Sequence, residues 1–101
     1  MKLSELIEKL EKYQQDKVVS MGFTNPHSYR GNYEQLAFEP KENVSVGEML
    51  RCSKDSLNKT FQGYKGGYFK MDENTLVNIA EYGCCGESIG PILMSYMLGD
   101  Y

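Results

Sequence analysis

The sequence predicts an α+β fold in which an antiparallel sheet of four to five strands carries two or three helices on one face. Three observations predict this class. Helical spacing of apolar residues recurs along the chain, runs rich in β-branched and aromatic residues lie between these segments, and the connections between neighbouring runs are short. Short connections favour antiparallel pairing of adjacent strands. With 101 residues, the chain has the length of one domain, which we expect to span residues 1–101.

The first half of the chain predicts one helix and two strands. Residues 3–14 have apolar residues at the spacing of one helix face and predict an amphipathic helix. Residues 17–23 are rich in valine and other apolar residues and predict a buried strand. Turn-forming dipeptides in residues 24–32 predict a loop that is long enough to carry a functional site. Residues 33–39 resume a strand, and Pro40 is expected to end it because proline cannot donate to a strand ladder.

The second half predicts a helix, three short strands and a closing helix. Ser45 and Glu48 have the spacing of a capping box, so the second helix should begin at Ser45. Residues 60–71 contain four aromatic residues and three glycines and predict a strand, a glycine-rich bend and another strand. Residues 75–82 predict a further strand. A tight loop follows, after which Pro91 should open the last helix.

Charge and composition narrow the possible partners. The chain has 11 Lys and Arg against 14 Asp and Glu, which gives a formal net charge of −3. This balance provides no basic field for duplex nucleic acid, whose binding depends on neutralising many phosphates. The longest apolar run is too short to cross a bilayer, and the N-terminal pattern is not that of a signal peptide. Three cysteines, two of them adjacent, fit a reducing compartment, so we expect a cytosolic protein without a membrane partner.

Two glycine-flanked loops carry the candidate binding residues. Each loop places one cation among tyrosines, and glycine lets backbone amides approach an anion closely. Arg30 has the fork geometry for a phosphate, Lys65 offers a point charge, and tyrosine rings can stack on a base. The predicted ligand-binding residues are His27, Tyr29, Arg30, Tyr64, Lys65, Gly66, Gly67 and Tyr68. The competing interpretation is that the tyrosines are half-buried at the bases of the loops and the two cations are only solvated, so that the loops bind no ligand.

The chain contains short matches to catalytic and metal-binding motifs, but the rest of the sequence does not fit them. The segment 86–90 matches the GxSxG nucleophile elbow, but that fold requires a histidine after the serine, and His27 is the single histidine. Adjacent Cys84 and Cys85 lack the spacing by which paired cysteines reach one zinc ion. Segment 63–67 places its lysine before a glycine pair, unlike a P-loop. We therefore predict no catalytic residue, no metal site and no cofactor.

Four strings in the chain resemble a family of small bacteriophage and prophage proteins. These strings are PHSYRGNYEQLAFEP at 26–40, VGEML at 46–50, TFQGYKGGYFKMDENT at 60–75 and YGCCGESIGPIL at 82–93, and with the opening LSELIEKLEKYQQDKVV the likeness covers nearly the whole chain. The resemblance implies an accessory phage protein in the cytoplasm of the bacterial host. In size and loop chemistry the chain is also similar to the Sequestin and Thoeris anti-defence groups, which sequester nucleotide signals, although no functional residue is carried over from them.

Together these features predict a non-enzymatic protein that binds and sequesters a nucleotide-derived immune second messenger, of the cyclic oligonucleotide or cyclic ADP-ribose type. Two charge-assisted phosphate contacts of about 1.5–3 kcal/mol each and one or two stacked bases of about 1–3 kcal/mol each give roughly 5–12 kcal/mol. Association costs about 4 kcal/mol or more, whereas nanomolar binding needs about −12 kcal/mol net. One protomer falls short, so we expect a homodimer or higher homo-oligomer whose loops enclose the ligand.

Two other functions compete with this one. The first is a protein-binding inhibitor of a host defence enzyme, of the anti-CRISPR or anti-restriction type, in which an open sheet face or exposed tyrosines form a hot-spot patch. The second is an enzyme acting on a nucleotide, for which the sequence offers no paired acid and base.

Overall fold

The computed structural model describes residues 1–63 and 65–99, and these residues form three helices and six strands in two sheets. In chain order the elements are α1 (Leu3–Glu11), β1 (Val18–Tyr29), β2 (Asn32–Ser45), α2 (Val46–Ser56), β3 (Thr60–Gln62), β4 (Tyr68–Lys70), β5 (Val77–Ile79), β6 (Glu87–Ser88) and α3 (Pro91–Leu98). The larger sheet has the order β1-β2-β5-β6, and β3 pairs with β4 in a separate hairpin. The structure confirms the α+β class.

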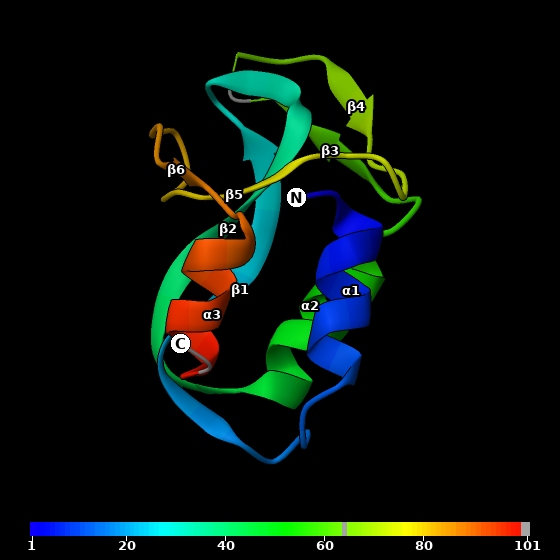
Figure 1. The fold of residues 1–101 in the computed structure, drawn as a ribbon. Helices are drawn as coiled ribbons and strands as arrows, with labels where there is room; N and C mark the ends of the chain where they lie inside the picture. Colours follow the sequence, from blue (N-terminus) through cyan, green and yellow to red (C-terminus); the bar gives the residue numbers. More distant parts are fainter. Residues whose placement is uncertain (64, 100–101) are drawn as a thin grey trace.

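The larger sheet is mixed because of one parallel pair. Strands β1 and β2 are antiparallel, as are β5 and β6, whereas β2 and β5 run parallel over three residue pairs. The chain between β2 and β5 includes α2 and the β3–β4 hairpin, and parallel strands need such a long crossover connection. The long β1–β2 hairpin curves along one side of the molecule, and the three helices lie inside that curve (Figure 1).

Two predictions about the β1–β2 hairpin are wrong. The predicted loop at 24–32 is mostly strand, since β1 continues to Tyr29. The Asn25-Pro26 turn sequence lies within this strand. The pairing of β1 with β2 shifts register there, and Asn25 is in the left-handed region at φ 48°. Nor does Pro40 end β2, which runs on to Ser45. Pairing of β2 with β5 ends at Phe38, so a proline at position 40 removes no hydrogen bond to β5.

The core lies between the sheet and the helices. Phe23 of β1 and Phe38 of β2 pack in a tilted arrangement with ring centroids 4.5 Å apart, and both are fully buried. Helix α1 contributes Leu3, Leu6 and Leu10, all of them fully buried and spaced on one helix face as the sequence predicts. Helix α3 adds three residues to the same core: Met94, Met97 and Leu98. None of the described helices has the length and the apolar composition needed to cross a membrane.

Both later helices begin as predicted. The Ser45 hydroxyl accepts a hydrogen bond from the Glu48 amide at 3.1 Å, which caps α2. Pro91 occupies the first turn of α3, and Gly99 ends that helix in the left-handed region at φ 71°. The predicted strand at 75–82 is shorter in the structure, where β5 pairs over Val77–Ile79.

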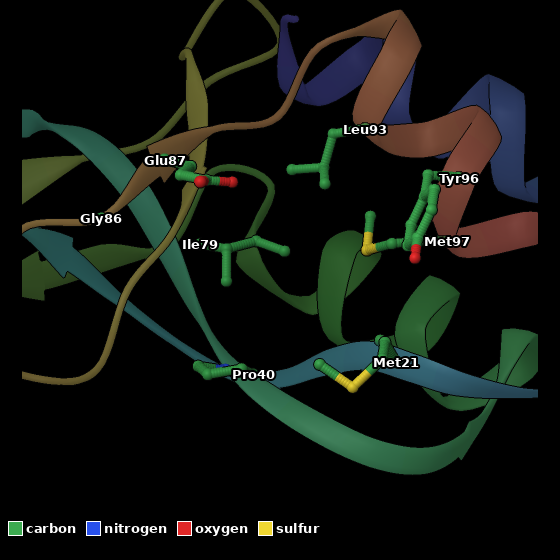
Figure 2. A pocket seen from close by; sticks show the side chains of 9 residues that line it. Met21, Pro40, Ile79, Gly86, Glu87, Leu93, Tyr96 and Met97 are labelled. Carbon is green, nitrogen blue, oxygen red and sulfur yellow. The ribbon is translucent and has the colours of Figure 1, made fainter.

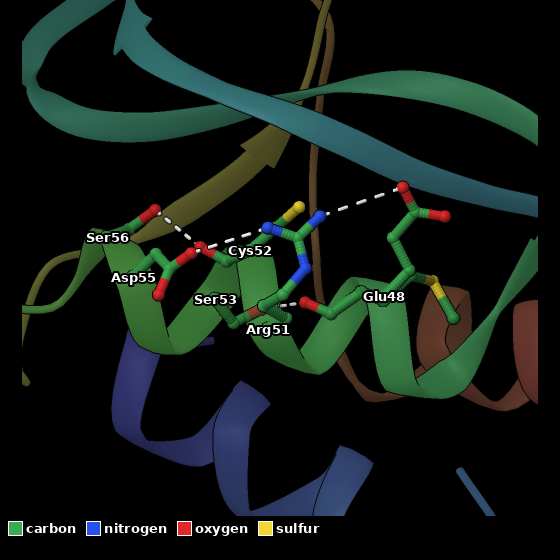
Figure 3. Close-up of polar contacts among 7 residues, drawn as sticks. Glu48, Arg51, Cys52, Ser53, Asp55 and Ser56 are labelled. Carbon is green, nitrogen blue, oxygen red and sulfur yellow. Dashed lines mark hydrogen bonds and ion pairs between the residues drawn. The ribbon is translucent and has the colours of Figure 1, made fainter. Parts of the chain in front are cut away.

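The outward face of α2 is charged and internally paired. Arg51 lies between Glu48, with Nη2 to Oε1 at 3.8 Å, and Asp55, with Nη1 to Oδ2 at 3.5 Å (Figure 3). All three side chains are largely exposed. This helix therefore buries one face in the core and presents to water a face whose charges already have partners.

Candidate functional site

Three loops meet at one end of the molecule, which we call the hairpin end: the β1–β2 turn at 29–32, the β3–β4 loop at 63–67 and the loop at 82–86. The turn and the β3–β4 loop both lie at the top of Figure 1. Tyr33, at the start of β2, packs on Phe69 of β4 with ring centroids 5.7 Å apart. Gly63 lies so close to Tyr33 that a Cβ there would be 3.1 Å from the Tyr33 ring. These contacts hold the two hairpins side by side.

The β1–β2 turn is tied to the 82–86 loop by side-chain hydrogen bonds. Arg30 Nη1 donates to the Gly83 carbonyl oxygen at 2.7 Å. The Tyr29 hydroxyl lies 3.1 Å from both the carbonyl oxygen and the amide nitrogen of Gly86, as donor to the first and acceptor from the second. Gly83 has φ 80°, a conformation that favours glycine. The guanidinium of Arg30 is therefore exposed at the tip of the hairpin but held in direction by the neighbouring loop.

His27 supports this arrangement from below. The side chain is buried, with Nε2 2.9 Å from the Ala80 carbonyl oxygen and Nδ1 3.1 Å from the Ser28 carbonyl oxygen. Its ring also meets the ring of Tyr82 edge-on, with centroids 5.5 Å apart. The side chain of His27 thus reaches from β1 to the segment that leads into the 82–86 loop, where it contacts Ala80 and packs against Tyr82.

The β3–β4 loop is closed by its own backbone. The Gly63 amide donates to the Gly67 carbonyl at 3.0 Å, and the Gly66 amide donates to the Gly63 carbonyl at 2.9 Å. Gly66 and Gly67 have φ values of 98° and 82°. Any residue with a Cβ would be strained at these positions, so the predicted glycine-rich bend needs glycine there. Lys65 is exposed at its tip. The predicted ligand residue Tyr64 lies outside the described residues.

Tyr68 lines a cavity that neither Arg30 nor Lys65 lines. Its side chain is 76% exposed, and it lines a polar cavity of about 430 Å³ together with Glu34, Lys70 and Asp72. Cavities of the described chain also occur near Asn58, next to Lys17 and beneath α3, and neither Arg30 nor Lys65 lines any of these four. A common hollow for the two cations stays a prediction.

Sequence reasoning missed Tyr82, Gly83 and Gly86, which the structure brings to Tyr29 and Arg30. The available signal was the pair of glycines that flank Cys84 and Cys85, the same pattern that marked the other two loops. Both cysteines are exposed and unbridged. The serine of the GxSxG match, Ser88, lies in β6 and donates to Asn78 at 3.1 Å.

Comparison of the chain with protein families, curated proteins and solved structures found no match. Within residues 1–63 and 65–99, no three His, Cys, Asp or Glu residues gather in a way that suits a metal ion. The hairpin end offers a positioned guanidinium, an exposed ammonium, glycine-rich backbone and exposed phenol rings. Such groups suit recognition of an anionic ligand that also carries a flat ring.

Proposed function

We propose that the chain is a phage-encoded, non-enzymatic protein that binds and sequesters a nucleotide-derived immune signal at the hairpin end, in the cytoplasm of the bacterial host. The observation that carries the proposal is the attachment of Tyr29 and Arg30 to the 82–86 loop by hydrogen bonds. A guanidinium whose direction is fixed before binding loses less conformational freedom on contact with a phosphate. The ligand that fits is a nucleotide with at least one accessible phosphate.

Aromatic rings at the same end support recognition of a base. Tyr82 is 55% exposed, and its ring packs against the buried His27 ring. Tyr68 is more exposed still, on the neighbouring hairpin. Stacking of one base on a tyrosine contributes about 1–3 kcal/mol, comparable to one charge-assisted phosphate contact at about 1.5–3 kcal/mol.

The surroundings of His27 support binding without catalysis. A general base needs a ring nitrogen within reach of a substrate proton. Both ring nitrogens of His27 face backbone carbonyl oxygens, and the side chain is buried. Without that residue, the hairpin end has no imidazole to pair with a carboxylate as acid and base.

A thermal-shift screen tests the proposal. Cyclic dinucleotides, cyclic trinucleotides and cyclic ADP-ribose are added to the pure full chain, and each ligand is then recovered. A ligand at 100 times its Kd adds about 2.7 kcal/mol, and a domain of this size gains roughly 4–8 °C per kcal/mol, so we expect a shift of about 10–20 °C. Intact ligand after recovery is the expected result, whereas a changed ligand would establish an enzyme.

Variants locate the site. Lys65→Ala and Arg30→Gln should each reduce the shift, because each removes one cation, whereas Lys41→Ala, an exposed lysine on the middle of β2, should leave it intact. Normal binding by both hairpin-end variants would show that the site is elsewhere. If no nucleotide shifts the protein and a lysate pulldown retains one host defence enzyme, the exposed Tyr68 and Tyr82 instead mark a protein-binding inhibitor.

A further inference from the structure

The outward side of α3 differs from every other helical surface of the described chain. Pro91–Leu98 contains no charged residue, and two of its apolar side chains face water one turn apart: Ile92 is 88% exposed and Tyr96 is 68% exposed. Val18 and Met21 of β1 are 60% and 51% exposed. We call Val18, Met21, Ile92 and Tyr96, together with the cavity that Met21 and Tyr96 line, the α3 surface.

An apolar cavity lies at the centre of the α3 surface. It has a volume of about 260 Å³ and opens between α3 and the sheet, with Met21, Leu93, Tyr96 and Met97 around it (Figure 2). Ile79 and Pro40 form its floor on the sheet, and Glu87 is the single charged residue among those that line it. Exposed apolar residues around an apolar cavity are typical of interaction sites.

A groove continues from this cavity along α3. The second cavity, next to Lys17, shares Tyr96 and Met97 with the first. The groove has opposite charges at its two ends. Glu87 lies at the end near the start of α3, in the first cavity. Lys17 lies at the other end, where its Nζ donates to the Leu98 carbonyl oxygen at 2.7 Å. The eight residues of α3, about 12 Å long at 1.5 Å per residue, lie between these two ends of the groove.

We propose that a second copy of this chain docks on the α3 surface, with the two α3 helices antiparallel about a two-fold axis that passes midway between Ile92 and Tyr96. In an isologous dimer each contact occurs twice with the roles exchanged. The antiparallel arrangement places Lys17 of each copy opposite Glu87 of the other, so the two charged ends of the groove are complementary to themselves. It also sets Ile92 of one copy against Tyr96 of the other and covers the apolar cavity.

The interface adjoins the nucleotide site at Gly86, which lines the apolar cavity and bonds to Tyr29, but most of the interface lies farther along α3. Helix α3 leads away from the hairpin end toward the C-terminus (Figure 1). Antiparallel α3 helices therefore place the two hairpin ends at opposite ends of the dimer, so each copy binds its own ligand. This differs from the expectation that loops of two protomers enclose one ligand, and it does not depend on the nucleotide proposal.

Sedimentation equilibrium of the full chain tests the dimer. The wild type should have twice the chain mass of 11.5 kDa at micromolar concentration. Ile92→Glu should weaken self-association about tenfold or more, because it places two carboxylates in an apolar contact. The matched control is Leu76→Glu, since Leu76 is an exposed apolar residue outside both the α3 surface and the hairpin end, and it should dimerise normally. Circular dichroism verifies that both variants are folded.

A charge exchange tests the antiparallel geometry. Lys17→Glu alone and Glu87→Lys alone each create two like-charged contacts in the dimer, so each variant should be mostly monomeric. An equimolar mixture of the two variants restores opposite charges at both contacts, and the dimer mass should return. A monomeric wild type, an unaffected Ile92→Glu dimer, or a mixture that stays monomeric would each overturn the proposal. So would a chain that stays monomeric and uses Ile92 to bind a different protein.

Discussion

The hairpin end and the α3 surface are both exposed, but they are built by opposite means. At the hairpin end, polar side chains hold loop backbone: Tyr29 and Arg30 bond to Gly86 and Gly83. At the α3 surface, aliphatic and aromatic side chains face water around a cavity lined almost entirely by apolar groups. The difference fits the two proposed binding tasks. A wet, cationic site suits a charged small molecule, whereas an apolar surface is stabilised only when another surface covers it.

The largest expected effect concerns Gly86, which connects the two regions. A Cβ at Gly86 would overlap the Ile79 carbonyl oxygen, and that backbone belongs to the β5–β6 pair. Gly86→Ala should therefore cost about 3 kcal/mol of unfolding free energy, measured by urea denaturation. Gly90→Ala is the matched control, because nothing lies within 4 Å of a Cβ there and its backbone is extended. Equal stability of the two variants would contradict the close packing of the 82–86 loop.

The next effect separates the two tasks. Ile92→Glu should weaken self-association about tenfold or more and leave the nucleotide thermal shift within error of the wild-type value. Lys65→Ala should do the reverse, with a reduced shift and an unchanged mass. The physical reason is that Lys65 is exposed at the hairpin end, whereas Ile92 lies on α3, which leads away from it. A variant that loses both properties while remaining folded would show that the two regions form one site.

The helices were the most predictable part of the fold. Their ends carry local signals, Ser45 at the start of α2 and Pro91 at the start of α3, and these signals act through neighbouring backbone atoms. The parallel pairing of β2 with β5 was not predictable in this way. It depends on residues 41 positions apart, such as Leu36 and Val77, and on a crossover that no short pattern records.

The β1–β2 hairpin shows why local signals also mislead. Asn25-Pro26 is a turn sequence, but here a register shift and the pairing of the flanking residues keep it within a strand. The same limit applies to the candidate site. Tyr29 and Arg30 were identified from their chemistry, whereas their partners Gly83 and Gly86 lie more than 50 residues away in sequence. Only the tertiary fold brings those loops together.

A smaller effect tests the polar anchor of the hairpin end. Tyr29→Phe keeps the ring but removes the hydroxyl that donates to and accepts from Gly86. We expect a loss of about 1 kcal/mol in unfolding free energy, the net value of an ordinary intramolecular hydrogen bond. Ligand affinity should also fall, because Arg30 is then presented by a looser loop. An unchanged affinity with reduced stability would assign Tyr29 to folding alone.

We expect the smallest effect from a substitution on α2, a helix that serves as the control for both regions. Arg51 has two exposed acidic partners, and exposed ion pairs of this kind contribute about 0–1 kcal/mol. Arg51→Ala should change the unfolding free energy by at most about 0.5 kcal/mol and should leave both dimer mass and ligand shift unaltered. The Lys17 and Glu87 exchanges should have much larger effects on self-association, although they too alter exposed charges. If Arg51→Ala dissociated the dimer as well, general surface charge would explain the effect, and the antiparallel contact would lose its support.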